Sequence, residues 1–428
     1  MHAVGQPDLH PGTKFPIGAV FVSKGWVHPP LIGGDIGCGM AWYKTKLSRS
    51  QVDGDRGRKV AEKLRGLEGP WRTRDEREEW LNDGRSCWAA GEEWDKLLGT
   101  IGAGNHFAEI QIVESVAGQD GRDGPGLRED EVVLLVHSGS RGYGGDVLKR
   151  YTAEGNHISL PEGDARTEAY MEEHERACEW AKANRDLIAL RIFACLEPGE
   201  TSWEVGLTGS VSGDVRSAKA KLRERKVVDI WHNNVERILW PPQPPPTATR
   251  PDDSIVDGAS SLSLDAAQRT YAYIHRKGAA PTYDPYTNTP LALLPLPGSR
   301  GTPTLILRPV FSPATSWGAK NALSLAHGAG RSMSRAKALA SLSQKYRSPE
   351  ALLEPTSTSR QAKSDGDGRG VSGGTWVVCE QKELVWEEAP EAYKDVWAVG
   401  DDLVGEEVAE VVGWCRARVS YKVRNEGR

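Results

Sequence analysis

The sequence lacks the features of membrane, secreted and nucleic-acid-coating proteins. No apolar run approaches the ~20 residues that span a bilayer, so we expect no membrane partner. The first residues, MHAVGQPDLHPGTKFPIG, have neither a cationic start nor an apolar stretch, so we expect no secretory signal. The net charge of -5 argues against coating long nucleic acids by phosphate neutralisation, although an enzyme that grips one strand end stays possible.

Cysteine is scarce, and internal repeats are absent. In 428 residues there are six cysteines, which form no CxxC pair and no dense framework: Cys38, Cys87, Cys178, Cys195, Cys379 and Cys415. This scatter is typical of reduced thiols, so we expect a reducing compartment, cytoplasmic or nuclear. It also disfavours a zinc finger, which needs paired ligands at short spacing.

Hydrophobic periodicity predicts a mixture of helices and strands. A helix is predicted over 165–196, where residues such as Ala177 and Leu187 continue a spacing of three to four before a Pro-Gly pair. A second is predicted over 334–346, with Ser334 as its N-cap. Short apolar, β-branched runs predict strands at 132–137, 304–310 and 375–379.

Three segments rich in Gly, Pro, Ser or Asp interrupt this pattern. They cannot bury much apolar surface, so we expect surface loops or disorder at 117–130, 241–262 and 347–374. Segments that carry chemistry flank all three. The sequence therefore predicts one domain over 1–428 with loop insertions, not several domains.

Several histidines share one kind of setting. Each stands at the end of an element beside Gly, Asn or Ser, whereas a core histidine more often lies among apolar neighbours: His106, His137, His232 and His327. Any one of them alone is more simply explained as a structural residue. The segment GGDIGCGM adds Asp35 and Cys38, and the recurrence favours a shared site.

Asp, Cys and His together suit a divalent transition metal such as zinc, manganese or cobalt. One thiolate can bridge two ions. Ligands drawn from several distant loops indicate an open catalytic site that could hold two metals, because structural sites are usually closed and local.

Glycine loops add anion chemistry. PLPGSRGT (295–302) and AHGAGRSMSR (326–335) offer backbone N–H groups, the second ahead of a helix, as in phosphate cradles. HRKGAAP supplies Arg276 and Lys277, which are equally well explained as a solvated basic patch. Metals with phosphate loops favour phosphoryl or nucleotidyl transfer, in which His327 is the natural covalent nucleophile.

The motifs, in their order, resemble those of RtcB-type RNA ligases over 5–422: PDLHPG, FPIGAV, GGDIGCGM, GAGNHFAE, HSGSRG, WHNN, HRKGAAP, PGSRGT, SLAHGAGRSMSR and EEAPEAYKDV. The details GCGM, HRKGAAP and PGSRG resemble the branch described as release-factor-H-coupled. The resemblance implies a single α+β domain with antiparallel sheets around a central two-metal cleft and helices outside.

The resemblance also implies an activity. Members of the family use GTP and two Mn²⁺ ions, and a histidine carries GMP covalently. GMP passes to an RNA 3′-phosphate, which a 5′-hydroxyl end then attacks; a 2′,3′-cyclic phosphate is first opened. We therefore expect RNA ends as partners, in tRNA splicing or RNA repair, with room for a protein partner.

Site residues follow from the motifs by resemblance. Metal ligands would be Asp35, Cys38, His106, His137 and His232. Cys38 would bridge the two ions, Asp35 and His106 would complete one, and His137 and His232 the other. His327 would be guanylylated, and the nucleotide would contact Asn105, His106, Glu109, Ser299, Gly301, His327, Gly328, Ala329, Gly330, Tyr393 and Lys422.

Two other functions stay open at this point. The chain could open cyclic phosphates or cap 3′ ends with GMP without sealing. It could instead be a catalytically impaired metal-binding protein that holds RNA ends or partners a translation factor. An intact His327 and a full ligand set favour the ligase, because a binding protein has no chemical need for that nucleophile.

Overall fold

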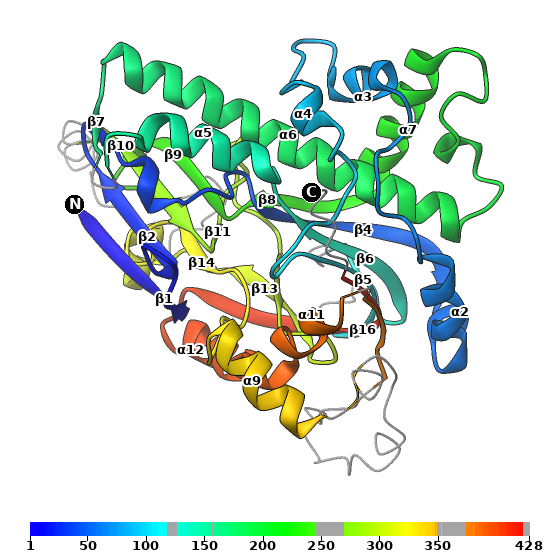
Figure 1. Ribbon diagram of the computed structural model, residues 1–428. Helices are drawn as coiled ribbons and strands as arrows, with labels where there is room; N and C mark the ends of the chain where they lie inside the picture. Colours follow the sequence, from blue (N-terminus) through cyan, green and yellow to red (C-terminus); the bar gives the residue numbers. More distant parts are fainter. Residues whose placement is uncertain are drawn as a thin grey trace, which may run out of the picture.

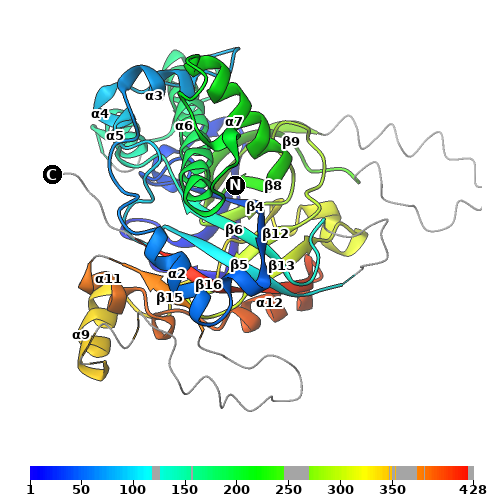
Figure 2. The ribbon, with the colours of Figure 1, turned by 90° about the vertical axis from the view of Figure 1, so that its right-hand side faces the viewer.

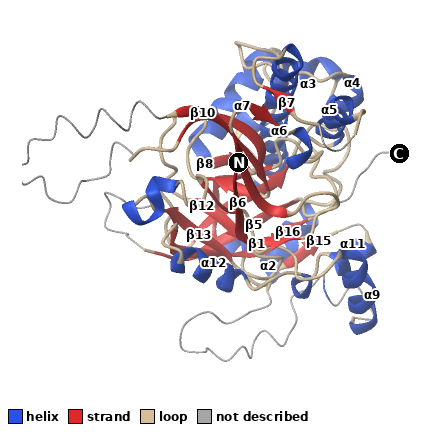
Figure 3. Cartoon of the chain, turned by 90° about the vertical axis from the view of Figure 1, so that its left-hand side faces the viewer, coloured by secondary structure: helices blue, strands red, loops and turns tan. Residues whose placement is uncertain are grey.

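Mostly antiparallel strands form the centre of the computed structural model, and helices cover them on the outside (Figure 1 and Figure 3). The structure describes residues 1–117, 126–155, 158–244, 269–346, 348, 352, 374–379 and 381–422. The mixture confirms the α+β fold class. Within the described residues, no helix combines the length and the apolar character needed to cross a bilayer.

The largest sheet carries the loops of the site. In spatial order its strands are β12 (Leu294–Pro297), β13 (Thr304–Pro309), β16 (Ala409–Tyr421), β5 (Phe107–Val116), β6 (Glu131–Ser138), β4 (Gly39–Ser48) and β8 (Lys226–Trp231). The short β15 (Trp376–Val378) runs parallel to β16. Strands distant in sequence are thus neighbours, which brings their ends together.

A second sheet stands beside the first. Its order is β1 (His2–His10), β2 (Ile17–Ser23), β10 (Thr270–Lys277) and β9 (Asn233–Trp240). Two-stranded pairs complete the β structure: β11 (Ala279–Pro281) with β14 (Ser324–Ala326), and β3 (Trp26–Val27) with β7 (Leu160–Pro161).

The helices gather on two sides of the strands. In Figure 1 the upper group is α3 (Arg74–Leu81), α4 (Glu92–Asp95), α5 (Gly142–Thr152), α6 (Ala165–Leu196) and α7 (Val211–Arg225). The lower group is α9 (Arg335–Lys345), α11 (Lys382–Glu387) and α12 (Val396–Gly405). The short α1 (Arg49–Val52) and α2 (Asp55–Lys63) follow β4, and Figure 2 shows α2 beside β16 and β15.

Alternation along the strands buries a different core on each face of the large sheet. In β4, Ala41 and Tyr43 face the core under α6, while Met40 and Trp42 face the core under α12. Each fully buried large side chain contributes roughly 1.5–3 kcal/mol. A one-residue slip would exchange the two faces, so this pattern fixes the register. It places Met40 opposite His137 of β6 and therefore sets Cys38 and His137 side by side.

Both predicted helices are confirmed. The first is α6, whose N-cap Asp164 accepts a hydrogen bond from the Arg166 N–H and which ends before Pro198. The second is α9, where the Ser334 side chain accepts from the Lys337 N–H as an N-cap. The predicted strands are confirmed as β6, β13 and β15.

The three predicted insertions lie largely outside the described residues. Of 117–130 the structure describes 117 and 126–130, of 241–262 only 241–244, and of 347–374 only 348, 352 and 374. Their assignment as loops, and the single domain that depends on it, therefore stays a prediction.

Candidate active site

Cys38 lies in the loop that enters β4. Its backbone N–H donates to the Asp35 carbonyl at 3.1 Å, which closes a tight turn. Gly37 in this turn has φ +75°, and a Cβ there would lie 2.8 Å from the Cα of Cys178 in α6. The turn therefore requires glycine, both for its left-handed backbone and for the close approach of α6. These two constraints explain the glycine that precedes Cys38 in the segment GGDIGCGM.

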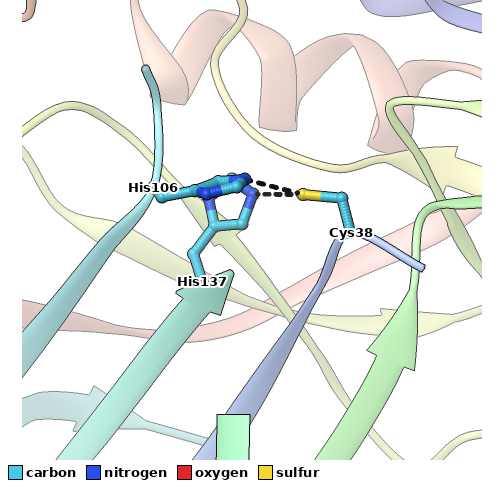
Figure 4. Close-up of side chains that lie close together, drawn as sticks. All are labelled: Cys38, His106 and His137. Atoms are coloured by element: carbon cyan, nitrogen blue, oxygen red, sulfur yellow. Dashed lines mark hydrogen bonds between the residues drawn. The ribbon is translucent and has the colours of Figure 1, made fainter. Parts of the chain in front are cut away.

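His106 and His137 approach the same sulfur from neighbouring strands. His106 directly precedes β5, and its Nδ1 donates to the Ile101 carbonyl at 3.2 Å, which turns Nε2 toward Cys38 Sγ at 3.3 Å. His137, near the end of β6, places Nε2 at 3.4 Å from Sγ (Figure 4). Asp35 Oδ2 lies 2.9 Å from His106 Nε2.

His232 completes the cluster from the β8–β9 turn. Its Nε2 lies 3.2 Å from Cys38 Sγ, and its backbone N–H donates to the Cys38 carbonyl at 2.8 Å. All five predicted metal ligands therefore converge around one sulfur. The separations equal those between ligands of a shared ion with bonds of about 2.0–2.3 Å.

The donor set fits a divalent transition metal. Burial, and then the neighbouring histidines, lower the pKa of His137 and His232 well below the usual value, so both rings are neutral, the form that can bind a metal. Each ring turns Nε2 toward Cys38, so Nε2 is the atom placed to bind a metal, while Nδ1 has no hydrogen-bond partner among the described residues. Burial and Asp35 raise the pKa of Cys38, so metal binding must displace a thiol proton.

His327 stands next to this cluster at the end of β14. Its ring centre is 4.7 Å from that of His232 and 6.5 Å from that of His137. Its Nδ1 donates to Oδ2 of Asp8 at 2.7 Å, and Asp8 is fully buried. Because the carboxylate fixes the proton on Nδ1, the Nε2 lone pair is free to act as a nucleophile.

The HRKGAAP motif contributes space next to His327. A Cβ at Gly278 would lie 2.9 Å from His327 Cε1, and the Gly278 N–H donates to Asn233 Oδ1 at 2.7 Å. The solvated basic patch is wrong for Arg276, which is buried and pairs with Glu236 at 2.5 Å. The β10–β9 register sets Arg276 opposite Asn234 and makes Glu236, on the same strand as Asn234, its diagonal neighbour.

A cavity of about 540 Å³ opens on one side of His327. Most predicted nucleotide residues line it: Asn105, Glu109, Ser299, His327, Gly328, Ala329, Gly330, Tyr393 and Lys422. Gly301 and His106 do not. Gly301 has φ +79° in the β12–β13 hairpin loop, where Thr302 N–H donates to the Ser299 carbonyl, so it shapes the loop instead.

Charged side chains at the far part of this cavity are paired through Glu388. Its buried carboxylate accepts from Lys422 at 3.2 Å, from Arg331 at 3.0 Å and from the Tyr393 hydroxyl. Burial opposes ionisation of Glu388, but Lys422 and Arg331 outweigh it and hold its pKa below the usual value. Glu109 lies on the same wall, and burial raises its pKa.

A second cavity of about 350 Å³ lies on the metal side. Its lining includes Asp35, Cys38, His232 and Lys277. Asn105 and His327 line both cavities, so the imidazole stands where they meet. One cavity can thus present a ligand to His327 from the side of Glu388, and the other from the side of the metal ligands.

Comparison with known proteins agrees with this site. The model of the family described as "tRNA-splicing ligase RtcB" matches residues 1–82, 71–237 and 263–423. The chain belongs to the RtcB family. The expected fold and the expected family are therefore confirmed, and the family is one of RNA ligases.

Relatives of this RtcB-family chain align over most of its length. The RNA-splicing ligase RtcB2 of Escherichia coli is 33% identical over 401 residues, which are 94% of this chain and 82% of that protein. The tRNA-splicing ligase RtcB of Methanococcus maripaludis is 26% identical, over 94% and 83% of the two chains. That of Aeropyrum pernix is also 26% identical, over 96% and 85%.

Sequence reasoning missed two carboxylates of the RtcB site. Asp8 lies in PDLHPG and Glu388 in EEAPEAYKDV, so the resemblance covered both motifs without giving these residues a role. A signal was present for Asp8, which is the one acid in its motif. Glu388 is one of several acids in its motif, so nothing in the sequence singled it out. What could not be foreseen is that β1 and β14 lie side by side, which brings Asp8 to His327.

Proposed function

We propose that the chain joins RNA ends that carry a 3′-phosphate or a 2′,3′-cyclic phosphate to ends that carry a 5′-hydroxyl. The reaction consumes GTP and proceeds through GMP bound to His327. The observation that carries the proposal is the placement of His327: a buried carboxylate holds its Nδ1, and the residue lines two cavities beside the candidate metal ligands. Membership of a family of RNA ligases supports the substrate class.

In the first step the Nε2 lone pair attacks the α-phosphorus of GTP. An N–P bond forms, the bond to the bridging oxygen breaks, and pyrophosphate leaves with the electron pair. Asp8 stabilises the imidazolium that develops, because its carboxylate already accepts the Nδ1 proton at 2.7 Å. Asn105 lies at the junction of the cavities, where its amide can donate to the α-phosphate.

In the next steps the RNA supplies the nucleophiles. An oxygen of the RNA 3′-phosphate attacks the phosphorus on His327, the N–P bond breaks, and GMP becomes attached to the RNA end. The 5′-hydroxyl of the second end then attacks the activated 3′-phosphate. The new phosphodiester forms, and GMP leaves with the electron pair of the broken anhydride bond, while the hydroxyl proton passes to solvent or a nearby base.

Each of the two substrates is assigned to one of the two cavities. The larger one, with Glu109, Ser299, Tyr393 and Lys422 on its walls, takes the guanine nucleotide. The smaller one, with Lys277 beside the metal ligands, takes the RNA end. Buried acid and amine side chains can read the donors and acceptors on the guanine edge, because a base that leaves them unpaired is strongly disfavoured.

Manganese fits the ligand set of Asp35, Cys38, His106, His137 and His232. When bound, two such ions would withdraw charge from the phosphoryl oxygens and orient the attacking oxygen. Cys38 would be central among the residues that hold them, since its sulfur lies within 3.4 Å of a nitrogen from each of three histidines.

The test is guanylylation followed by ligation. Wild type and His327→Ala are incubated with α-labelled GTP and Mn²⁺ and separated on a denaturing gel. We expect a labelled wild-type band that is lost in the variant. A labelled RNA with 5′-hydroxyl and 2′,3′-cyclic phosphate ends is then added, and joined strands or circles are expected.

Other outcomes separate the remaining functions. A 3′-modified strand without joined product would mean that the chain opens or caps ends but does not seal them. No label in the wild type, although manganese is shown to bind, would contradict the proposal and leave a metal-binding protein that holds RNA ends or a translation factor.

A further inference from the structure

Two consecutive polar residues lie in the middle of α6 and have no role in the chemistry so far. Asn184 is 0% exposed and Arg185 is 1% exposed. A buried arginine is costly, because its charge must be removed from water and fully paired. The question is therefore which segments of the chain the hydrogen bonds of this arginine hold together.

Asn184 joins the segments next to two metal ligands. Its Oδ1 accepts from the Gly99 N–H at 2.7 Å, and its Nδ2 lies 3.2 Å from the Thr100 carbonyl, in the loop that leads to His106. The same Nδ2 lies 3.1 Å from Ser138 Oγ and 3.2 Å from the Gly139 carbonyl, directly after His137.

Arg185 joins the segments next to the other ligands. Its Nη1 donates to the carbonyl of Gly37, which precedes Cys38, at 3.0 Å, and to the carbonyl of Ser138 at 3.1 Å. Its Nε and Nη2 donate to Oδ1 of Asp229 at 2.9 and 2.7 Å. Asp229 lies in β8, three residues before His232.

Together the pair contacts the backbone or strand beside four ligands from four separate segments: Cys38, His106, His137 and His232. We infer that Asn184 and Arg185 are positioning residues that hold these segments in the metal-binding arrangement before an ion arrives. The inference rests on the proposed metal centre. Ordering the ligands in advance reduces what binding must fix, and partners of this kind affect metal affinity about 10–100-fold.

The competing explanation is that the pair only stabilises the core. The chain provides a matched control for it. Arg225 of α7 is also buried, and it pairs with Glu197 at 3.1 and 3.2 Å just past the end of α6. This pair also bonds the backbone of Lys44 and Lys46 in β4, well away from the ligand loops.

The experiment compares Arg185→Lys and Asn184→Ser with Arg225→Lys. Each metal-free full-length chain is titrated with Co²⁺, and the thiolate-to-cobalt and ligand-field absorption bands are followed. Melting temperatures are measured without metal. We expect the first two variants to bind Co²⁺ about 10–100-fold more weakly with altered band intensities, while Arg225→Lys melts earlier but binds Co²⁺ like the wild type.

A clear result would overturn the inference. If Arg185→Lys and Asn184→Ser melt earlier as Arg225→Lys does but keep wild-type affinity and spectrum, the pair serves stability alone. If Arg185→Lys does not fold, Asn184→Ser gives the same comparison. A wild-type chain that binds no Co²⁺ would overturn the proposed metal centre itself. This outcome differs from failure of the positioning role, because the wild type alone shows it.

Discussion

The two sides of His327 differ in how their polar groups are satisfied. On the proposed metal side, the Cys38 sulfur lies within 3.4 Å of the Nε2 atoms of three histidines. On the nucleotide side, Glu388 already pairs with Lys422, Arg331 and Tyr393. The first side gathers neutral donors at one point, whereas the second balances an acid against cations.

This difference indicates which kind of ligand each side is suited to bind. Neutral rings and a protonated thiol gain most from a cation that satisfies several of them at once. Paired charges instead form a fixed wall against which a nucleotide can be placed with little rearrangement. We expect metal-side substitutions to act on metal binding, and nucleotide-side substitutions to act on GTP binding.

The largest expected effect lies at the boundary of the two sides. Asp8→Asn keeps the shape of the contact but removes the carboxylate that holds the Nδ1 proton of His327. By analogy with other His–Asp pairs, guanylylation should slow about a hundred- to ten-thousandfold. Single-turnover labelling with α-labelled GTP measures it. Co²⁺ affinity equal to the wild type is the control, and a rate within threefold of wild type would contradict the assigned tautomer.

On the metal side, Cys38→Ser should weaken Co²⁺ or Mn²⁺ binding by more than about a hundredfold. A hydroxyl is a poorer ligand for these ions than a thiolate, and the change removes the atom on which three histidines converge. Cys178→Ser is the matched control, because that buried thiol packs behind the same turn but contacts His174. Equal losses in both variants would refute the special role of Cys38.

On the nucleotide side, Glu388→Gln should raise the KM for GTP about tenfold, the size of one lost charged hydrogen bond. Lys422 and Arg331 then lose the anion that orients them, while metal affinity stays unchanged. The control is Glu391→Gln, three residues later, whose carboxylate pairs with Lys345 in a half-exposed position. A loss of metal affinity in Glu388→Gln would show that the two sides are not separate.

The smallest expected effect is on the unfolding free energy and arises from His174, a buried residue of α6. Burial lowers the pKa of His174 to about 4, and its Nε2 accepts from the Val235 N–H. Between pH 6.5 and 4 the unfolded chain binds a proton that the folded chain refuses, so the unfolding free energy falls as pH falls. From pH 7 to 5.5 this residue should account for about 1 kcal/mol. Denaturant unfolding of His174→Gln should show a smaller loss, and an equal loss would exclude His174 as a source.

Local features of the fold could be predicted from the sequence, and long-range ones could not. Periodicity and caps predicted α6 and α9, because those signals lie within the helix itself. The order of strands in the large sheet depends on pairings between segments more than a hundred residues apart, such as Thr304 with Cys415 or Val116 with Gly413. No local pattern encodes these pairings.

The candidate site divides in the same way. The five candidate metal ligands were predicted from their residue types and motifs, and the structure brings these residues together; their role as ligands stays a prediction. Arg276 was not correctly placed, because its partner Glu236 becomes its neighbour only through the β10–β9 register. Asp8, Glu388 and the Asn184–Arg185 pair act through contacts with other segments, so their roles became visible only in three dimensions.

The position of His327 between two cavities also bears on the order in which the proposed substrates bind and products leave. Pyrophosphate can depart through the larger cavity while an RNA end already waits in the smaller one. Neither substrate then has to leave before the other can enter its own cavity. The steady-state kinetics should therefore show no obligatory order between GTP and RNA, and preloaded RNA should not block the formation of the covalent nucleotide.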